Sequence, residues 1–596
     1  MRTIERFPSL TAMFFARAQA GGDAPFLSRK RDGMWQSLSW RDVAQQVASL
    51  AAALKAEGLR PGDRVMLVSE NRPEFCIADL AIMAAGCVTV PTYTTNTIRD
   101  HAHILTDSGA TAVIVSTAKL AKTLLPAVLR SQARLVIGME PIRGMQGDSV
   151  RCALWDTLIA AHPIDIAECA AAQTATRDDL ACIIYTSGTG GAPRGVMQHH
   201  GSILCNVEGA LKLLIEDFGG WEDEIFLSFL PLSHAYEHSG GQFLPIISGA
   251  QIYYAESLEK LAGNIEEVRP TLMVVVPRLF EVLRARVLKG IEKQGKVPMM
   301  LLNQALRVGE KRLTGRSSLL DLPMRLLVDR TIRPKVQQRF GGRIKAMVSG
   351  GAPLNPDVGI FFHSLGITML QGYGQTEAGP VISCNRPKVG IAMDTVGPPL
   401  DGVEVRIAED GELLVRGELV MHGYWRNPAE SERVLIDGWL HTGDIGEIDA
   451  KGRIKITDRK KDLIVNDKGD NVAPQKIEGM LTLQPEIGQV MVSGDKRPYI
   501  VGLIVPDAEW VRDWAKAKGV ASDLPSLSQN TDFIAAIREA VDKVNADLSV
   551  TERVRRFVLA DEPFSVDNEE MTPSMKIRRH VIRTRYQQRM DALYKA

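Results

Sequence analysis

The sequence predicts an α/β protein, in which parallel sheets are covered by helices and a smaller C-terminal domain follows. Short apolar runs of strand length alternate with stretches of helical period, as expected when helices connect parallel strands. From Val403 onward the pattern changes to short alternating strands with glycine turns, and a more charged tail follows. The apolar runs expected to form the parallel strands are 65–68, 112–115, 181–185, 272–276 and 344–348.

The first long amphipathic helix is expected after Ser39, a residue type that favours the N-cap position. The apolar residues that follow have spacings of four, three and four, which place them on one helical face. They are Val43, Val47, Leu50 and Leu54. Gly58 stands where a left-handed residue would end the helix. Farther along, residues 289–340 have helical propensity and contain a loop between helices at 311–318.

The composition is that of a globular protein with a large core. The chain has 596 residues, 45% hydrophobic and 24% charged, which excludes a disordered or collagen-like chain. Because 71 basic residues balance 71 acidic ones, no overall field favours a nucleic acid, and none is expected as a partner. Contact with an anionic membrane would require a local patch.

The cysteines and the chain start favour a cytoplasmic protein. Seven cysteines occur singly without a C-x-x-C pair, as is typical of free thiols in a reducing compartment. Residues 1–8 lack the apolar stretch of a secretory signal, and no apolar run reaches the ~18–20 residues of a membrane span. The basic end, 576–589, could contact lipid peripherally on the inner membrane face, but a solvated helical face is the simpler interpretation.

The most informative segment is 185–195, Tyr-Thr-Ser-Gly-Thr-Gly-Gly-Ala-Pro-Arg-Gly, which follows an apolar strand. Glycines let backbone N–H groups turn toward phosphate oxygens, hydroxyls add donors, and the cation offsets charge. The segment matches neither G-x-x-x-x-G-K-[ST] nor G-x-G-x-x-G. A glycine-rich turn after a strand can be purely structural, so its companion motifs must decide whether it binds a polyphosphate.

This segment resembles the signature loop of the adenylate-forming superfamily, which includes acyl-CoA synthetases, peptide-synthetase adenylation domains and firefly luciferase. Further family motifs follow in order at 229–237, 349–353, 372–377, 439–444, 458–462 and 572–576. Segments 231–238 and 276–281 and the helical stretch before Gly341 most resemble bacterial long-chain fatty-acid–CoA ligases. Two positions depart from the pattern: Gly190 replaces a Thr, and Arg194 replaces the usual Lys with a planar fork.

The resemblance implies where ATP and Mg²⁺ would bind. Glu377 and Thr189 would position Mg²⁺, for which hard oxygen ligands are appropriate, and Thr376 would touch the α-phosphate. Tyr373 would lie against adenine, although alone it would be read as a core aromatic and Glu377 as a solvated loop acid. The phosphate loop would contribute Thr186, Ser187, Gly188, Thr189, Gly191 and Arg194, and the adenine side Gly351, Ala352 and Gly374.

The resemblance also implies a ribose site and a hinge. Asp444 would accept both ribose hydroxyls, because a carboxylate has two acceptor oxygens, and Arg459 would contact the nucleotide. Lys461 would be the hinge of a small, mobile α+β domain. The adenylation domain, which includes a β-subdomain, would then be 1–458 and the mobile domain 459–596. Gly469 resembles the glycine that admits the pantetheine arm of CoA. Without this context Asp444 would be a turn residue and Arg459 part of a solvated charge run.

Lys576 is the residue implied for catalysis of the first step. An ammonium that reaches both the substrate carboxylate and the α-phosphate stabilises charge where the bond forms. His234 resembles a residue lining the acyl or pantetheine passage, although a structural role is equally consistent. His199 and His200 lack partners at metal-ligand spacing and are interpreted as structural.

The sequence therefore predicts an ATP-dependent fatty-acid–CoA ligase with Mg²⁺, ATP and CoA as cofactor and co-substrates. A fatty acid and ATP would give acyl-AMP and pyrophosphate, and CoA would then displace AMP. Two alternatives stay open, a ligase that loads a carrier protein and a catalytically silent homologue that binds lipid or nucleotide. Acyl chain length and oligomeric state do not follow from the sequence.

Overall fold

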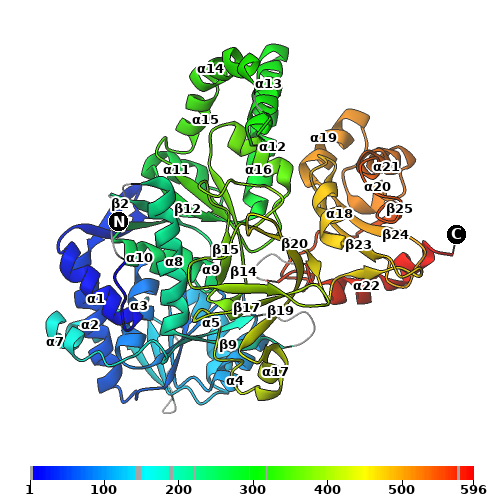
Figure 1. Cartoon of the computed structure of the whole chain (residues 1–596). Coiled ribbons are helices and arrows are strands. Elements are labelled where there is room, and N and C mark those ends of the chain that lie inside the picture. The colour runs from blue at the N-terminus through cyan, green and yellow to red at the C-terminus, as the bar shows by residue number, and fades with distance from the viewer. Residues whose placement is uncertain are drawn as a thin grey trace.

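The computed structural model describes residues 4–142, 150–186, 192–219, 223–293, 295–313, 315, 316, 318–572 and 577–595. Two large sheets covered by helices form the N-terminal part, which confirms the predicted α/β class (Figure 1). Among the helices in these ranges, none combines the length and the apolar character that a membrane span requires.

The first sheet has seven strands in the order β7-β6-β5-β3-β4-β8-β9, parallel except for the antiparallel pair β8 and β9. Its predicted runs 65–68, 112–115 and 181–185 fall in β3, β5 and β8. The strands are β3 (Arg64–Val68), β4 (Val88–Thr92), β5 (Ala112–Val115), β6 (Leu135–Gly138), β7 (Arg151–Leu154), β8 (Leu180–Thr186) and β9 (Arg194–His199). The helices of this region are α1 (Leu10–Gly21), α2 (Trp40–Ala56), α3 (Pro73–Ala84), α4 (Ile98–Ser108), α5 (Ala118–Val128), α6 (Trp155–Ala161) and α7 (Ile166–Ala171).

Helix α2 forms as its sequence predicts. The Ser39 hydroxyl accepts a hydrogen bond from the backbone N–H of Asp42, and the Asp42 carboxylate accepts one from the Ser39 N–H, a reciprocal capping box. The predicted stripe of apolar residues is buried. Gly58 follows the helix with a φ of 84°, the left-handed conformation that a glycine adopts without strain.

The second sheet has eight strands in the order β15-β14-β13-β12-β10-β11-β1-β2, with antiparallel pairs at both ends. The strands are β1 (Pro25–Arg31), β2 (Met34–Ser39), β10 (Ile225–Ser228), β11 (Gln251–Tyr254), β12 (Leu272–Val275), β13 (Ala346–Ser349), β14 (Met369–Gly374) and β15 (Val381–Cys384). The other helices here are α8 (His200–Phe218), α9 (Ala235–Glu237), a π-helix (His238–Phe243), α10 (Leu244–Ser248), α11 (Leu261–Val268), α16 (Pro356–Ser364) and the 3₁₀ turn η3 (Thr376–Ala378).

A helical arm is inserted between β12 and β13 and projects from the sheets (Figure 1). It confirms the helical propensity of 289–340. Its elements are α12 (Pro277–Glu292), α13 (Lys296–Leu313), η2 (Leu319–Asp321), α14 (Leu322–Thr331) and α15 (Arg333–Arg339). At its base, Leu302 of α13 and Phe280 of α12 are fully buried beside Phe362 of α16.

The short strands after Val403 form a β-subdomain that packs on the large sheets. Tyr424 and Leu440 share one apolar cluster with Val196 of β9 and Ala378 of η3. Its elements are β16 (Glu404–Ile407), β17 (Glu412–Arg416), α17 (Pro428–Val434), β18 (Leu435–Ile436), β19 (Trp439–Ile448) and β20 (Ile454–Arg459).

The C-terminal part has apolar clusters of its own, which begin at Ile464. It contacts the arm through Leu483, which packs on the cluster of Phe280 and Phe362, and through an ion pair between Lys289 and Glu509. Its strands are β21 (Ile464–Val465), β22 (Asn471–Val472), β23 (Ile487–Ser493), β24 (Ile500–Pro506) and β25 (Val554–Leu559). Its helices are α18 (Pro474–Leu481), α19 (Ala508–Lys518), α20 (Leu524–Leu527), α21 (Thr531–Asn545) and α22 (Arg579–Ala592).

Candidate active site

The base of the glycine-rich loop is a pair of antiparallel strands. Thr186, the last residue of β8, lies opposite Arg194, the first residue of β9, so the chain returns on itself between them. The His103 ring bonds the Pro193 carbonyl through Nε2 at 2.8 Å and fixes the returning strand. The loop residues Ser187, Gly188, Thr189 and Gly191, together with the departure at Gly190, lie outside the described residues.

Arg194 and Glu377 are brought together by Tyr424, a residue that the sequence analysis did not single out. The Arg194 guanidinium lies over the Tyr424 ring, 4.5 Å from its centroid. The Tyr424 hydroxyl donates a hydrogen bond to Glu377 Oε1 at 2.9 Å. Burial and the Glu377 carboxylate raise the pKa of Tyr424, so the hydroxyl stays protonated and able to donate.

A second residue missed from the sequence is Glu430, in the first turn of α17. Its carboxylate forms an ion pair with Arg194 and another with Arg433. The helix places Glu430 there because the Asn427 side chain caps its N-terminus, accepting from the Glu430 backbone N–H at 3.2 Å. In this structure the Arg194 charge is therefore directed at a carboxylate of its own chain.

Tyr373, Asp444 and Arg459 form one hydrogen-bonded group. The Tyr373 hydroxyl donates to Asp444 Oδ2 at 2.7 Å, and Arg459 Nε donates to Asp444 Oδ1 at 2.9 Å. Burial and the neighbouring carboxylate raise the pKa of Tyr373 well above its usual value. Burial alone would lower the pKa of Arg459, but Asp444 raises it. Asp444 is 3% exposed and keeps a free lone pair on each oxygen for a further donor.

One segment connects the two groups, because Tyr373 is the second-last residue of β14 and Glu377 lies in η3, four residues later. The backbone between them is held by Gln198, whose Nε2 donates to the Thr376 carbonyl at 2.8 Å. Gly374 is needed by the fold itself, since a Cβ there would lie 1.9 Å from the Pro380 carbonyl oxygen. Tyr373, Thr376 and Glu377 thus share one segment, and Asp444 and Arg459 are bonded to its first residue, Tyr373.

Gly351 and Ala352 follow β13, the parallel neighbour of β14, and are exposed. Gly351 has a φ of 81°, which favours glycine. They lie beyond the carboxyl end of β13, the edge of an α/β sheet at which ligands commonly bind. This position agrees with the predicted adenine pocket, although adenine contact remains a prediction.

The segment after β20 carries the predicted hinge. β20 pairs with β19 so that Arg459 lies opposite Asp444, and the Lys460 N–H donates to the Gly443 carbonyl at 2.9 Å. Lys461 is exposed and follows directly. Asp458 is 6% exposed; its Oδ2 has no hydrogen-bond partner among the described residues, and burial raises its pKa to about 6.

Three further predicted residues have separate positions. Lys576 lies outside the described residues. Gly469 lies in the exposed connection of the β21–β22 hairpin with a φ of 87°, so the turn alone accounts for a glycine there. His234 is half-buried and caps α9 by accepting from the Tyr236 N–H at 3.2 Å, which suits the structural interpretation.

His199 and His200 are buried and bond within the fold, which suits the structural interpretation. The His199 ring bonds the Arg177 carbonyl and stacks on His422 at 4.3 Å between centroids. No cluster of His, Cys, Asp or Glu suited to holding a metal ion occurs within the described ranges. Of the two residues predicted to position Mg²⁺, Glu377 lies within these ranges, and its contact with the ion stays a prediction. Glu377 suits this role because its Oε2 has no partner in the described part of the chain.

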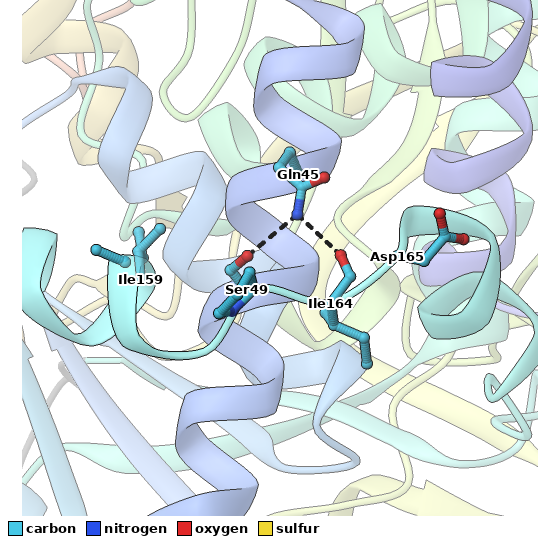
Figure 2. A pocket seen from close by; sticks show the side chains of 7 residues that line it. Gln45, Ser49, Ile159, Ile164 and Asp165 are labelled. Atoms are coloured by element: carbon cyan, nitrogen blue, oxygen red, sulfur yellow. Dashed lines mark hydrogen bonds between the residues drawn. The ribbon is translucent and has the colours of Figure 1, made fainter.

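A surface hollow of about 520 Å³ lies elsewhere, between α2 and the connection from α6 to α7. Figure 2 shows that Gln45 spans it, with Nε2 donating to Ser49 Oγ at 3.2 Å and to the Ile164 carbonyl at 2.9 Å. No cation lines it, and α7 lies on the far side of the large domain from β19 (Figure 1). It is therefore not part of the nucleotide site.

Comparison with known proteins places the chain in a family. The family model described as AMP-binding enzyme matches residues 14–425, and the AMP-binding enzyme C-terminal domain matches residues 461–596. Long-chain-fatty-acid–CoA ligase FadD15 of Mycobacterium tuberculosis is 33% identical, over 99% of this chain and 98% of the relative. Human long-chain-fatty-acid–CoA ligase 1 is 30% identical, over 97% of this chain and 85% of the relative.

Solved structures agree in fold. The adenylation domain of a carboxylate reductase from Mycobacterium chelonae has a TM-score of 0.78 at 22% identity, covering 99% of this chain and 92% of that one. The A domain of a carboxylic acid reductase from Segniliparus rugosus, in complex with AMP and a carboxylic acid, has a TM-score of 0.75 at 21% identity, covering 99% and 95%. With the sequence match, these findings show that the chain belongs to the AMP-binding enzyme family.

Proposed function

We propose that this protein is an ATP-dependent fatty-acid–CoA ligase that makes acyl-AMP and then acyl-CoA. The observation that carries the proposal is the convergence of two side-chain groups on one segment, 373–377. One contains Asp444 and Arg459 and the other Glu377 and Arg194. Two relatives that match nearly the whole chain are named long-chain-fatty-acid–CoA ligases, which supports the same substrate class here.

In the first step the chain's residues would bind and neutralise ATP. Asp444, already oriented by Tyr373 and Arg459, would accept the ribose hydroxyls. Arg194 would exchange Glu430 for phosphate oxygens, and a planar guanidinium suits two such oxygens. Mg²⁺, held by Glu377 and Thr189, would offset the charge of the departing pyrophosphate.

Lys576 would complete the site for bond formation. Its ammonium would lie near both the fatty-acid carboxylate and the α-phosphate, so that the carboxylate oxygen attacks phosphorus and pyrophosphate leaves. Removing one such preorganised donor typically costs about 10²–10³ in rate. The C-terminal domain would then turn about Lys461, and the CoA thiol would attack the acyl carbon while AMP leaves, with pantetheine passing Gly469.

The domain turn would require contacts between the C-terminal part and the arm to open. Among the described residues these contacts include Leu483 against the Phe280 cluster and ion pairs of Lys289 with Glu509 and Asp513. All three charged side chains are about half exposed or more, where such pairs contribute little stability. The interface is thus suited to opening. A cytoplasmic location belongs to the proposal and is supported by the seven free thiols.

The test is AMP release in the presence of CoA, measured for carboxylic acids from acetate to oleate and for aryl acids. Thioester formation with long-chain acids is expected. Accumulation of acyl-AMP without thioester would instead favour a carrier-protein acceptor, and absence of ATP–pyrophosphate exchange would indicate a silent homologue. In Lys576→Ala, adenylation is expected to collapse while thioester formation from supplied acyl-AMP survives; equal loss of both would contradict the domain turn.

A further inference from the structure

The outer half of the helical arm carries leucines that the described part of the chain leaves exposed. Leu320 is 91% exposed, and Leu322, Leu326 and Leu327 are each 42–47% exposed. Leu322 and Leu326 stand one turn apart on α14 and Leu327 follows beside them, whereas Val328 is buried within the arm. Figure 1 places α14 at the outer end of the arm, away from both sheets.

The same arm is strongly basic in a protein whose overall charge is zero. Residues 289–339 contain twelve Lys and Arg against four Asp and Glu, a formal net charge of +8. Of the four acids, Asp321 and Asp329 are engaged in ion pairs with basic residues of the arm. Arg312, Arg316 and Arg330 are exposed, and no carboxylate lies within ion-pair distance of them among the described residues.

The basic C-terminal segment, by contrast, is neutralised within the fold. Arg579 pairs with Glu478, Arg585 with Glu562 and Glu570, and Arg589 with Asp561. Its charge is therefore largely directed inward at carboxylates of the same domain. The simpler interpretation of this segment fits these contacts, whereas Arg312, Arg316 and Arg330 of the arm have no carboxylate partner among the described residues.

We propose that the tip of the arm, made up of the described residues from Arg312 to Arg330, docks on an anionic lipid surface. Exposed leucines bordered by unpaired arginines are the features by which surface-lying amphipathic helices bind such membranes. The leucines would enter the acyl boundary while Arg312, Arg316 and Arg330 meet lipid phosphates. The advantage of docking rests on the proposed function. Long-chain acids dissolve in bilayers, so a ligase bound to the membrane surface would take up its substrate there.

The test is sedimentation of the full-length protein with vesicles of phosphatidylglycerol and phosphatidylcholine, without ATP or fatty acid. We expect binding that grows with the phosphatidylglycerol fraction and weakens with salt, because charges near a surface are screened. The triple variant Arg312→Gln, Arg316→Gln, Arg330→Gln is expected to lower the partition coefficient at least about tenfold. Leu320→Glu tests the contribution of the exposed leucines to vesicle binding. Leu320 is so exposed that its side chain contributes little to folding.

The matched control is Val550→Glu, which changes a side chain 65% exposed in the C-terminal part. It is expected to bind vesicles as wild type does. Wild-type protein that ignores anionic vesicles, or arm variants that bind unchanged, would overturn the proposal. A change of sedimentation coefficient in Leu320→Glu without lipid would overturn it in favour of a contact between two copies. Activity on a soluble short-chain acid is read separately, so failure of docking and failure of the ligase are distinguishable.

Discussion

Tyr424 donates a hydrogen bond to Glu377 at 2.9 Å while its ring supports the guanidinium of Arg194. One side chain thus contacts both the proposed metal ligand and the proposed phosphate ligand. Removing its hydroxyl and removing its ring should have different effects. This difference separates a positioning role from simple packing.

Tyr424→Phe keeps the ring under Arg194 and removes the hydrogen bond to Glu377. We expect kcat/KM for ATP to fall about fivefold, the cost of one hydrogen bond of about 1 kcal/mol. The loss should be larger at limiting Mg²⁺, because Glu377 would be free to turn. ATP–pyrophosphate exchange against Mg²⁺ concentration measures it, with Tyr499→Phe in the C-terminal part as control. A loss independent of Mg²⁺ would refute the positioning role.

Asp444→Asn should weaken ATP binding and erase discrimination between ATP and 2′-deoxy-ATP. Hydrogen bonds to a charged acceptor contribute about 1.5–3 kcal/mol each, so KM for ATP should rise about 10–100-fold. Comparing KM for both nucleotides in wild type and variant checks this. If the variant still prefers ATP over the deoxy form, Asp444 does not hold the ribose.

Glu430→Gln should improve ATP binding. In the structure Glu430 holds Arg194, so the nucleotide must compete with a carboxylate that the substitution neutralises. We expect KM for ATP to fall up to about fivefold with little change in kcat, since a partly exposed pair contributes at most about 1 kcal/mol. The partner of Glu430 on the other side, Arg433, offers the control Arg433→Gln. A higher KM for Glu430→Gln would mean that Glu430 orients Arg194 productively.

Asp458→Asn should stabilise the protein at neutral pH but not at pH 4. Burial raises the pKa of Asp458 to about 6, so the folded state holds a proton more tightly than the unfolded state. Stability therefore falls as pH rises from about 4 to about 6, and the neutral amide avoids that loss. A gain on the order of 1–2 kcal/mol is expected at pH 7.5, measured by denaturant unfolding at both pH values. An equal gain at both would show that ionisation is not the cause.

The strands and helices could be predicted because they depend on patterns of neighbouring residues in the sequence. Buried parallel strands read as short apolar runs, so 272–276 and 344–348 closely matched β12 and β13. The capped helix after Ser39 likewise formed as expected. The motif residues Tyr373, Glu377, Asp444 and Arg459 came from the resemblance. In the structure the side chains of Tyr373, Asp444 and Arg459 are hydrogen-bonded to one another, and Glu377 lies four residues after Tyr373.

The contacts that complete the site could not be predicted. Tyr424 reaches Glu377 because a bridge from Val196 to Tyr424 docks the β-subdomain on β9, and no local pattern reports that docking. Glu430 meets Arg194 across 236 positions in the sequence for the same reason. Gly469 has a φ of 87°, so its turn accounts for a glycine, and its role in admitting pantetheine stays a prediction.

The pairing of β19 with β20 sets Arg459 against Asp444 only two residues before Lys461. In the proposed cycle, Asp444 and Arg459 would hold the ribose, and the domain turn would begin two residues farther along the chain, at Lys461. The C-terminal domain could then turn a different face toward the active site while the adenosine part of acyl-AMP stays bound. The acyl-AMP, a mixed anhydride that water can hydrolyse, would thus stay bound from its formation until the CoA thiol attacks it.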